Sequence, residues 1–126
     1  MIDEQYLRSA LRDVYDAETP LNIIELGIVE TIAIAEDHDA PGAGIPGVRK
    51  RFRANISITP INPDSEATPM LIERIKNRLA GLEALSETVV ITLDSPRWTP
   101  QRITPAGYAQ LEAQRIQKNL IQIKIP

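Results

Sequence analysis

The strict alternation of side chains from Arg51 to Thr59 is the feature that most constrains the fold. Apolar residues stand at positions 52, 54, 56 and 58, and Arg53, Asn55 and Ser57 lie between them. Successive side chains of a strand point to opposite faces of its sheet. The pattern therefore predicts a strand with one face on the core and the other toward water.

Two further strands are expected. Residues 28–35 form a β-branched run that is typical of a strand, and residues 88–93 form another. Between the first two strands, residues 37–50 contain two prolines and three glycines, which predicts a surface loop. We expect these two strands to pair as an antiparallel hairpin with a long loop.

Three segments have the apolar spacing of helices. The first follows Asp3, a capping residue, and should end near Asp16. The second should run to Ala80, with Thr68 as its cap and Pro69 as its first helical residue. The third should begin at Pro105, with Thr104 as its cap, and the alternating residues 121–125 predict a short C-terminal strand.

The expected element order is helix, strand, strand, helix, strand, helix. We therefore predict an α+β fold, in which helices pack on one face of a small, mixed three-stranded sheet. The 126 residues have the length of one domain, which we assign to residues 1–126, with a core at 5–112 and a C-terminal extension at 113–126.

Composition excludes several classes of function. A net charge of −3 argues against binding to nucleic acid, because such proteins normally present a basic face. No apolar run is long enough to span a bilayer, and the acidic N-terminus has no signal core, so we expect a cytoplasmic protein. The chain has no cysteine and a single histidine, His38, so a metal site would need carboxylates or a partner.

Polar residues that could carry function gather in an acidic turn. Asp16, Glu18 and Glu25, with Asn22 between them, could bind a metal or contact a partner. The alternative is that they bond to nearby backbone in a turn after a helix, as Asp and Asn commonly do.

Two later segments also contain candidates. Ser65 lies where a helix is about to begin, but without a nearby base it is better suited to capping than to nucleophilic catalysis. Trp98 and Thr99 lie between two prolines, and the tryptophan either anchors a loop or contacts a partner. The basic run 49–53 fits a solvated strand face.

Three motifs in order give the chain a family resemblance. The stretch 16–29 (Asp-Ala-Glu-Thr-Pro-Leu-Asn-Ile-Ile-Glu-Leu-Gly-Ile-Val) resembles the entry motif of the SufT/PaaD family, with Ala17 in place of the usual proline. The turn at 58–65 resembles the family's strand-to-helix turn, and Ser-Pro-Arg-Trp-Thr-Pro at 95–100 resembles its late Trp-Thr-Pro loop. The segment at 103–107 is similar to the PaaD branch.

The resemblance implies a role in iron–sulfur protein maturation, in a family that includes the small targeting subunit of the eukaryotic cytosolic pathway. It implies partners that are iron–sulfur apo-proteins or an assembly scaffold, and homodimers. Ser65 stands where the family usually has a cysteine. A hydroxyl is a poor ligand for cluster iron, so we expect no resident cofactor and at most a transient cluster.

The leading hypothesis is a non-enzymatic adaptor with one surface site. Its residues would be Asp16, Glu18, Asn22, Glu25, Ser65, Thr68, Trp98 and Thr99. One alternative is an interaction module without a cluster role, acting by dimerisation or by strand addition through residues 121–125. The other is a hydrolase that uses the carboxylates with a divalent metal.

Overall fold

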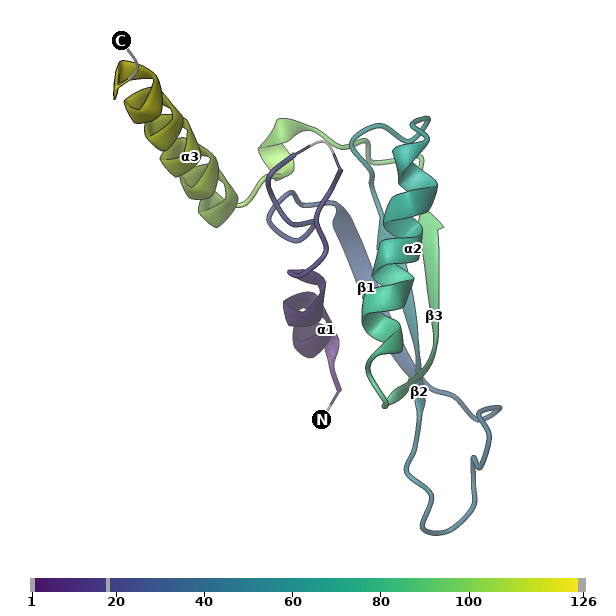
Figure 1. Ribbon diagram of the computed structural model, residues 1–126. Coiled ribbons are helices and arrows are strands. Elements are labelled where there is room, and N and C mark those ends of the chain that lie inside the picture. The colour runs from purple at the N-terminus through teal and green to yellow at the C-terminus, as the bar shows by residue number, and fades with distance from the viewer. Residues whose placement is uncertain (1, 18, 125–126) are drawn as a thin grey trace.

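The computed structural model describes residues 2–17 and 19–124, with side chains described as far as residue 116 of the last helix (Figure 1). The predicted order of helices and strands is confirmed. The elements are α1 (Glu4–Leu11), β1 (Val29–Glu36), β2 (Phe52–Ile58), α2 (Ala67–Ala80), β3 (Leu85–Thr92), the 3₁₀ turn η1 (Pro100–Arg102) and α3 (Pro105–Lys124).

The three strands form one mixed sheet in the order β1-β2-β3. The first two pair antiparallel, with Glu36 opposite Phe52 at the end that carries the loop. The third pairs parallel to β2, with Ile58 opposite Thr92 at the other end. A parallel pair needs a crossover connection, which α2 supplies. Both α1 and α2 lie over the same face of the sheet (Figure 1).

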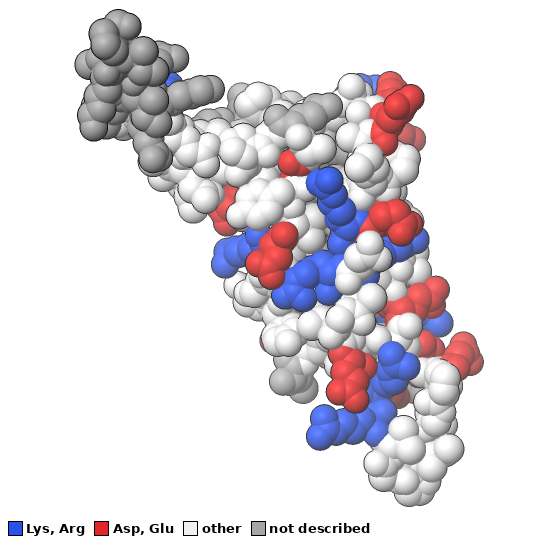
Figure 2. Space-filling model, viewed as in Figure 1, with Lys and Arg blue, Asp and Glu red and all other residues white. Residues whose placement is uncertain are grey.

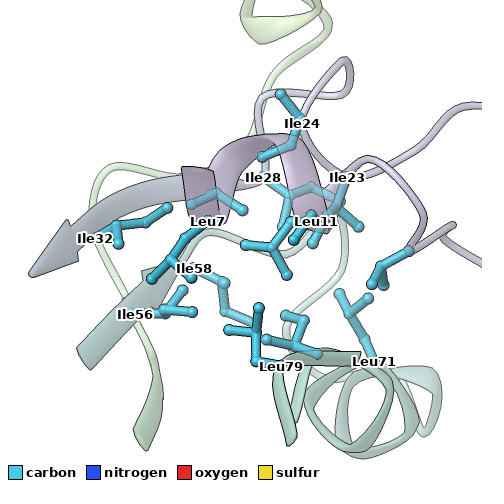
Figure 3. Close-up of a cluster of buried hydrophobic side chains, with 14 of the residues drawn as sticks. Leu7, Leu11, Ile23, Ile24, Ile28, Ile32, Ile56, Ile58, Leu71 and Leu79 are labelled. Carbon is cyan, nitrogen blue, oxygen red and sulfur yellow. The ribbon is translucent and has the colours of Figure 1, made fainter. Parts of the chain in front are cut away.

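The core lies between this sheet face and the two helices (Figure 3). Ile56 and Ile58 of β2 meet Leu7 of α1 and Leu79 of α2, and all four are at most 1% exposed. Burying a side chain of this size stabilises the fold by about 1.5–3 kcal/mol relative to leaving it exposed. Ala54, Ile56 and Ile58 of β2 are buried as the alternation predicted, whereas Phe52 is only half-buried and Ser57, which was expected to face water, is buried as well.

Helix boundaries differ from expectation for local reasons. The first helix ends at Leu11, where the N–H groups of Arg12 and Asp13 bond three residues back and tighten the chain into turns. The second begins at Ala67, so Thr68 is not its cap and Pro69 is its third residue. Proline is tolerated throughout a first helical turn, because the N–H groups there have no partner within the helix.

The predicted C-terminal strand is wrong for residues 121–124, since α3 continues without a break to Lys124. Residues 109–118 are rich in Ala, Gln, Glu, Lys and Arg, which favour a helix, and the helix extends through the alternating segment. Ile125 lies outside the described residues. Strand β3 also begins at Leu85, three residues earlier than predicted. The polar residues at 86 and 87 interrupt the β-branched run from which the strand was predicted.

The loop between β1 and β2 forms a separate lobe at one end of the sheet (Figure 1). A series of tight turns shapes it, with Ala43 N–H donating to Ala40 O at 3.0 Å and Val48 N–H donating to Ile45 O at 3.1 Å. Its far part, residues 40–48, contains no charged residue and is white in the space-filling view (Figure 2). Among the described residues, no helix could cross a membrane.

Candidate functional site

The turn from β2 into α2 builds the first part of the site. Ser65 Oγ accepts the N–H of Ala67 at 3.1 Å, and Thr68 Oγ1 donates to Asn62 O at 3.1 Å. The Ser65 N–H also donates to Asn62 O, at 3.1 Å. These bonds hold the turn in one shape and place Ser65 just before the helix, where free N–H groups favour a hydroxyl or an anion.

Asp16 reaches this turn from a distant part of the chain. Together with Ser65 and Thr68 it lines a small hollow of about 10 Å³. The hollow is lined by Asp16, Pro60, Ile61, Asn62, Ser65, Ala67, Thr68 and Leu71, and we call it the serine hollow. Three residues that the sequence nominated from two separate segments therefore lie in one place.

A second hollow of about 60 Å³ adjoins the first. It is lined by Thr59, Pro60, Ile61, Pro63, Leu93, Asp94, Pro96, Arg97 and Trp98, and we call it the tryptophan hollow. Pro60 and Ile61 line both hollows, so they form the wall between Ser65 and Trp98. Sequence reasoning missed these two residues, although their position inside the strand-to-helix motif was a usable signal.

Trp98 is held in place by the loop that precedes β1. Its indole Nε1–H donates to Leu26 O at 2.7 Å, and its ring packs against the core while remaining partly exposed. The loop that carries Trp98 is also tied to the end of β2, because the buried Thr59 hydroxyl donates to Pro96 O at 2.7 Å. Trp98 thus anchors its loop and still presents part of its surface to the tryptophan hollow.

Asn22 and Glu25 hold the fold together and line neither hollow. The buried Asn22 Oδ1 accepts the N–H groups of Ile24 at 3.0 Å and Glu25 at 2.9 Å. The Glu25 carboxylate accepts the hydroxyl hydrogen of Thr104 and lies 3.5 Å from the Arg12 guanidinium. The structure therefore places these two residues in the joint between the turn at 22–27 and the start of α3.

The remaining nominated residues are Thr99 and Glu18, and neither is among the described residues that line the hollows. Thr99 is exposed, precedes η1 and lines neither hollow. Glu18 lies outside the described residues. Within residues 2–17 and 19–124, no group of three or more His, Asp or Glu side chains is arranged to hold a metal ion.

Asp37, a carboxyl group with a shifted pKa, lies at the opposite end of the sheet. A hydrogen bond from Ser86 lowers the pKa of Asp37 below its usual value, against the opposing effect of burial. The Ser86 hydroxyl donates to Asp37 Oδ2 at 2.5 Å, and Arg53 lies 3.4 Å from Oδ1 of the same carboxylate. Asp37 N–H donates to Arg51 O at 2.8 Å, so this cluster closes the base of the loop.

The fold and the paired hollows define a class of protein. It is a small α+β domain in which a polar turn leads into the second helix, and an anchored tryptophan lies beside that turn. No family model matches the sequence, and no curated protein matches it. Solved structures share the fold. A domain of unknown function, DUF59, from Bacillus anthracis superposes with a TM-score of 0.69 at 20% identity, covering 86% of this chain and 91% of that one.

Two other solved structures have the same architecture. A conserved hypothetical protein from Thermotoga maritima matches with a TM-score of 0.64 at 21% identity, over 87% of this chain and 94% of its own. A Mycobacterium tuberculosis protein, described as associated with Fe–S complex assembly and repair, matches with a TM-score of 0.50 at 23% identity, over 85% of this chain and 81% of its own. The chain therefore has the fold of DUF59 domains.

Proposed function

We propose that this protein is a non-enzymatic adaptor in iron–sulfur protein maturation, of the SufT/PaaD type. The observation that carries the proposal is the meeting of Asp16 and Ser65 in one hollow, at the turn where the family resemblance puts a cysteine. The fold shared with a protein associated with Fe–S complex assembly and repair supports it.

The chemistry of the hollow favours holding a partner over holding a cluster. Iron–sulfur clusters are bound by thiolates, and this chain has no cysteine to supply one. The Ser65 hydroxyl already accepts a backbone N–H, and the neighbouring walls are proline, isoleucine and tryptophan side chains. Such a surface suits contact with a partner protein, because apolar walls with few polar groups give both contact area and orientation.

The partners in this proposal are iron–sulfur apo-proteins or an assembly scaffold in the cytoplasm, and the adaptor acts as a homodimer. The cluster is cargo that the partners carry, so no step of the proposal runs through a cluster bound by this chain. Nucleic acid and membranes have no part in it.

Anaerobic capture tests the proposal. The tagged protein, bound to resin, is exposed to purified iron–sulfur apo-proteins and to a scaffold protein, and retention is measured. Ile61→Glu places a charge in the wall between the hollows and should weaken retention about tenfold or more, because the contact must then bury an unpaired carboxylate. Ile45→Glu, at 57% exposure in the distant loop, is the matched control and should retain the partner.

A second candidate is an interaction module with no cluster role, favoured by the serine at the cysteine position. Ser65→Cys separates the two. After anaerobic incubation with iron and sulfide, cluster absorbance for Ser65→Cys and none for Ser9→Cys, an exposed serine on α1, would indicate a degenerate cluster site at this turn and favour the iron–sulfur role. Equal absorbance in both variants, or none in either, together with no retained partner, would exclude the iron–sulfur adaptor and favour the interaction module. Strand addition through residues 121–124 is not part of that candidate, since they are helical.

A further inference from the structure

Three hollows adjoin one another at the end of the sheet that carries the loop, where the turn after α2 and the start of α1 also lie (Figure 1). The first, of about 360 Å³, lies within the loop lobe, and the second, of about 500 Å³, shares Arg49, Lys50 and Arg51 with it. The third, of about 410 Å³, shares Glu83 and Ala84 with the second. Because they share walls, the hollows form one elongated surface, which we call the end groove. It is lined from within residues 36–51 and 81–84 and by Ile2 and Tyr6.

The second hollow, in the middle of the end groove, is positively charged. Its charged side chains are three cations, Arg49, Lys50 and Arg51, and one carboxylate, Glu83. The Arg51 guanidinium is held in place, because it donates to Glu83 O at 3.3 Å and to Leu85 O at 2.8 Å. Both acceptors are carbonyl groups, so Arg51 keeps its charge and further N–H donors. A cation that is already fixed loses little conformational entropy when an anion binds to it.

Arg49 and Lys50 carry unused binding groups on their main chain as well. Arg49 is exposed and forms no ion pair within residues 2–17 and 19–124, whereas Lys50 lies 3.4 Å from Glu36. The main-chain N–H and C=O groups of Arg49 and Lys50 make no hydrogen bond to any other described residue. Free main-chain groups beside pockets for side chains are what the recognition of an extended peptide uses.

Both ends of the end groove present apolar side chains. In the loop lobe, Ile45 is 57% exposed and Val48 is 46% exposed. At the other end, Tyr6 is 51% exposed and lies beside Ile2 and Leu82. Exposed apolar side chains that gather around a hollow are typical of interaction sites. The occupant that complements this surface is apolar at both ends and negatively charged between them.

We propose that the end groove binds an extended segment of a partner protein, in which acidic residues are flanked by apolar ones. The carboxylates meet Arg49 and Arg51 in the middle hollow, and the apolar side chains enter the hollows on either side. Charge complementarity of this kind orients a partner and excludes segments of the wrong sign. Three hollows in a row with free main-chain groups between them suit a peptide better than a compact small molecule.

The end groove lies at the opposite end of the sheet from the serine and tryptophan hollows. A protein bound at the hollows therefore leaves the end groove accessible to a second protein. The inference rests on different residues from the proposed function, and either can fail without the other.

Selection from a phage-displayed library of random short peptides tests the inference. The full chain is the bait at low salt, and an enriched peptide is synthesised with a fluorescent label. We expect enriched peptides to carry Asp or Glu between apolar residues, and their binding to weaken as salt is added, because the groove cations are exposed to solvent. No enrichment, or enriched peptides without acidic residues, overturns the proposal.

Fluorescence anisotropy of the labelled peptide then locates the binding. Arg49→Glu should raise the dissociation constant about tenfold or more, because it reverses a charge that faces the peptide carboxylates. Lys76→Glu, at an exposed cation of α2 that lines none of the three hollows, is the matched control and should bind as the parent does. Circular dichroism checks that both variants fold. Equal weakening by both variants overturns the proposal.

A second pair of variants tests the apolar end of the groove. Tyr6→Ser should weaken peptide binding and Tyr15→Ser should not, although the two tyrosines are similarly exposed, at 51% and 47%. Ile61→Glu, in the wall between the serine and tryptophan hollows, acts on the capture of iron–sulfur apo-proteins and should not change the affinity for the peptide. If Ile61→Glu weakens peptide binding and Arg49→Glu does not, the peptide binds at the hollows and the proposal is wrong.

Discussion

At the scale of single residues, the clearest electrostatic feature is the Asp37 carboxylate at the base of the loop. It accepts hydrogen bonds from the Ser86 hydroxyl at 2.5 Å and from the Asp39 N–H at 3.0 Å, and it pairs with Arg53. The Ser86 bond is the main cause that lowers the pKa of Asp37. A charged carboxylate is therefore favoured in the folded state, and this preference links stability to pH.

Ser86→Ala should raise the pKa of Asp37, as measured by NMR titration. Because the folded-state pKa is depressed, the stabilisation is present above the unfolded pKa of about 4 and is lost as the pH falls through the folded value. Urea unfolding should thus show the variant less stable than the parent at pH 7, with the difference shrinking below about pH 4. A difference that is constant with pH would show that Ser86 acts through packing alone.

At the scale of elements, the turn at 22–27 and the segment 98–104 form a joint that organises one end of the molecule. Gly27 has φ of +72°, and a Cβ added there would lie 2.2 Å from Arg102 O. Arg102 in turn donates to Gly27 O at 2.9 Å and pairs with Glu30. Only glycine permits this approach of two backbones, so the joint depends on one residue type at one position.

Gly27→Ala should therefore destabilise the protein more than Gly44→Ala. Both glycines have positive φ, which costs an alanine about 1–2 kcal/mol, but nothing lies within 4 Å of the Cβ position at Gly44. At Gly27 the clash with Arg102 should add about 1–3 kcal/mol. Urea unfolding of the two variants measures the difference, and equal losses would mean that the two segments separate at little cost.

At the scale of the whole molecule, the loop and the two hollows lie at opposite ends of the sheet (Figure 1). The loop leaves β1 at Glu36 and enters β2 at Phe52, whereas Pro60 and Ile61 follow the other end of β2. The 37–50 loop is thus no lid over the candidate site. On the face shown in Figure 2, acidic and basic side chains are intermixed, with no broad patch of one sign.

Replacing residues 41–48 by Asn-Gly should leave partner capture unchanged. The shortened loop keeps the Asp37 cluster, and changes in loop length cost only about 0.6 kcal/mol for each twofold change. The free energy of unfolding should shift by about 1 kcal/mol or less, as measured in urea. If capture is lost while stability is retained, the loop itself contacts the partner, and the proposed position of the binding surface is wrong.

The order of elements and the inner face of β2 could be read from the sequence, because alternation and helical spacing are local patterns that neighbouring residues set together. The resemblance also located Asp16, Ser65 and Trp98. Tertiary structure alone decided that Asp16 meets Ser65 in the serine hollow, and that Glu25 binds Thr104 in a joint away from both hollows. Such contacts join residues far apart in the chain, and no local pattern of side chains specifies which distant backbone will lie beside them.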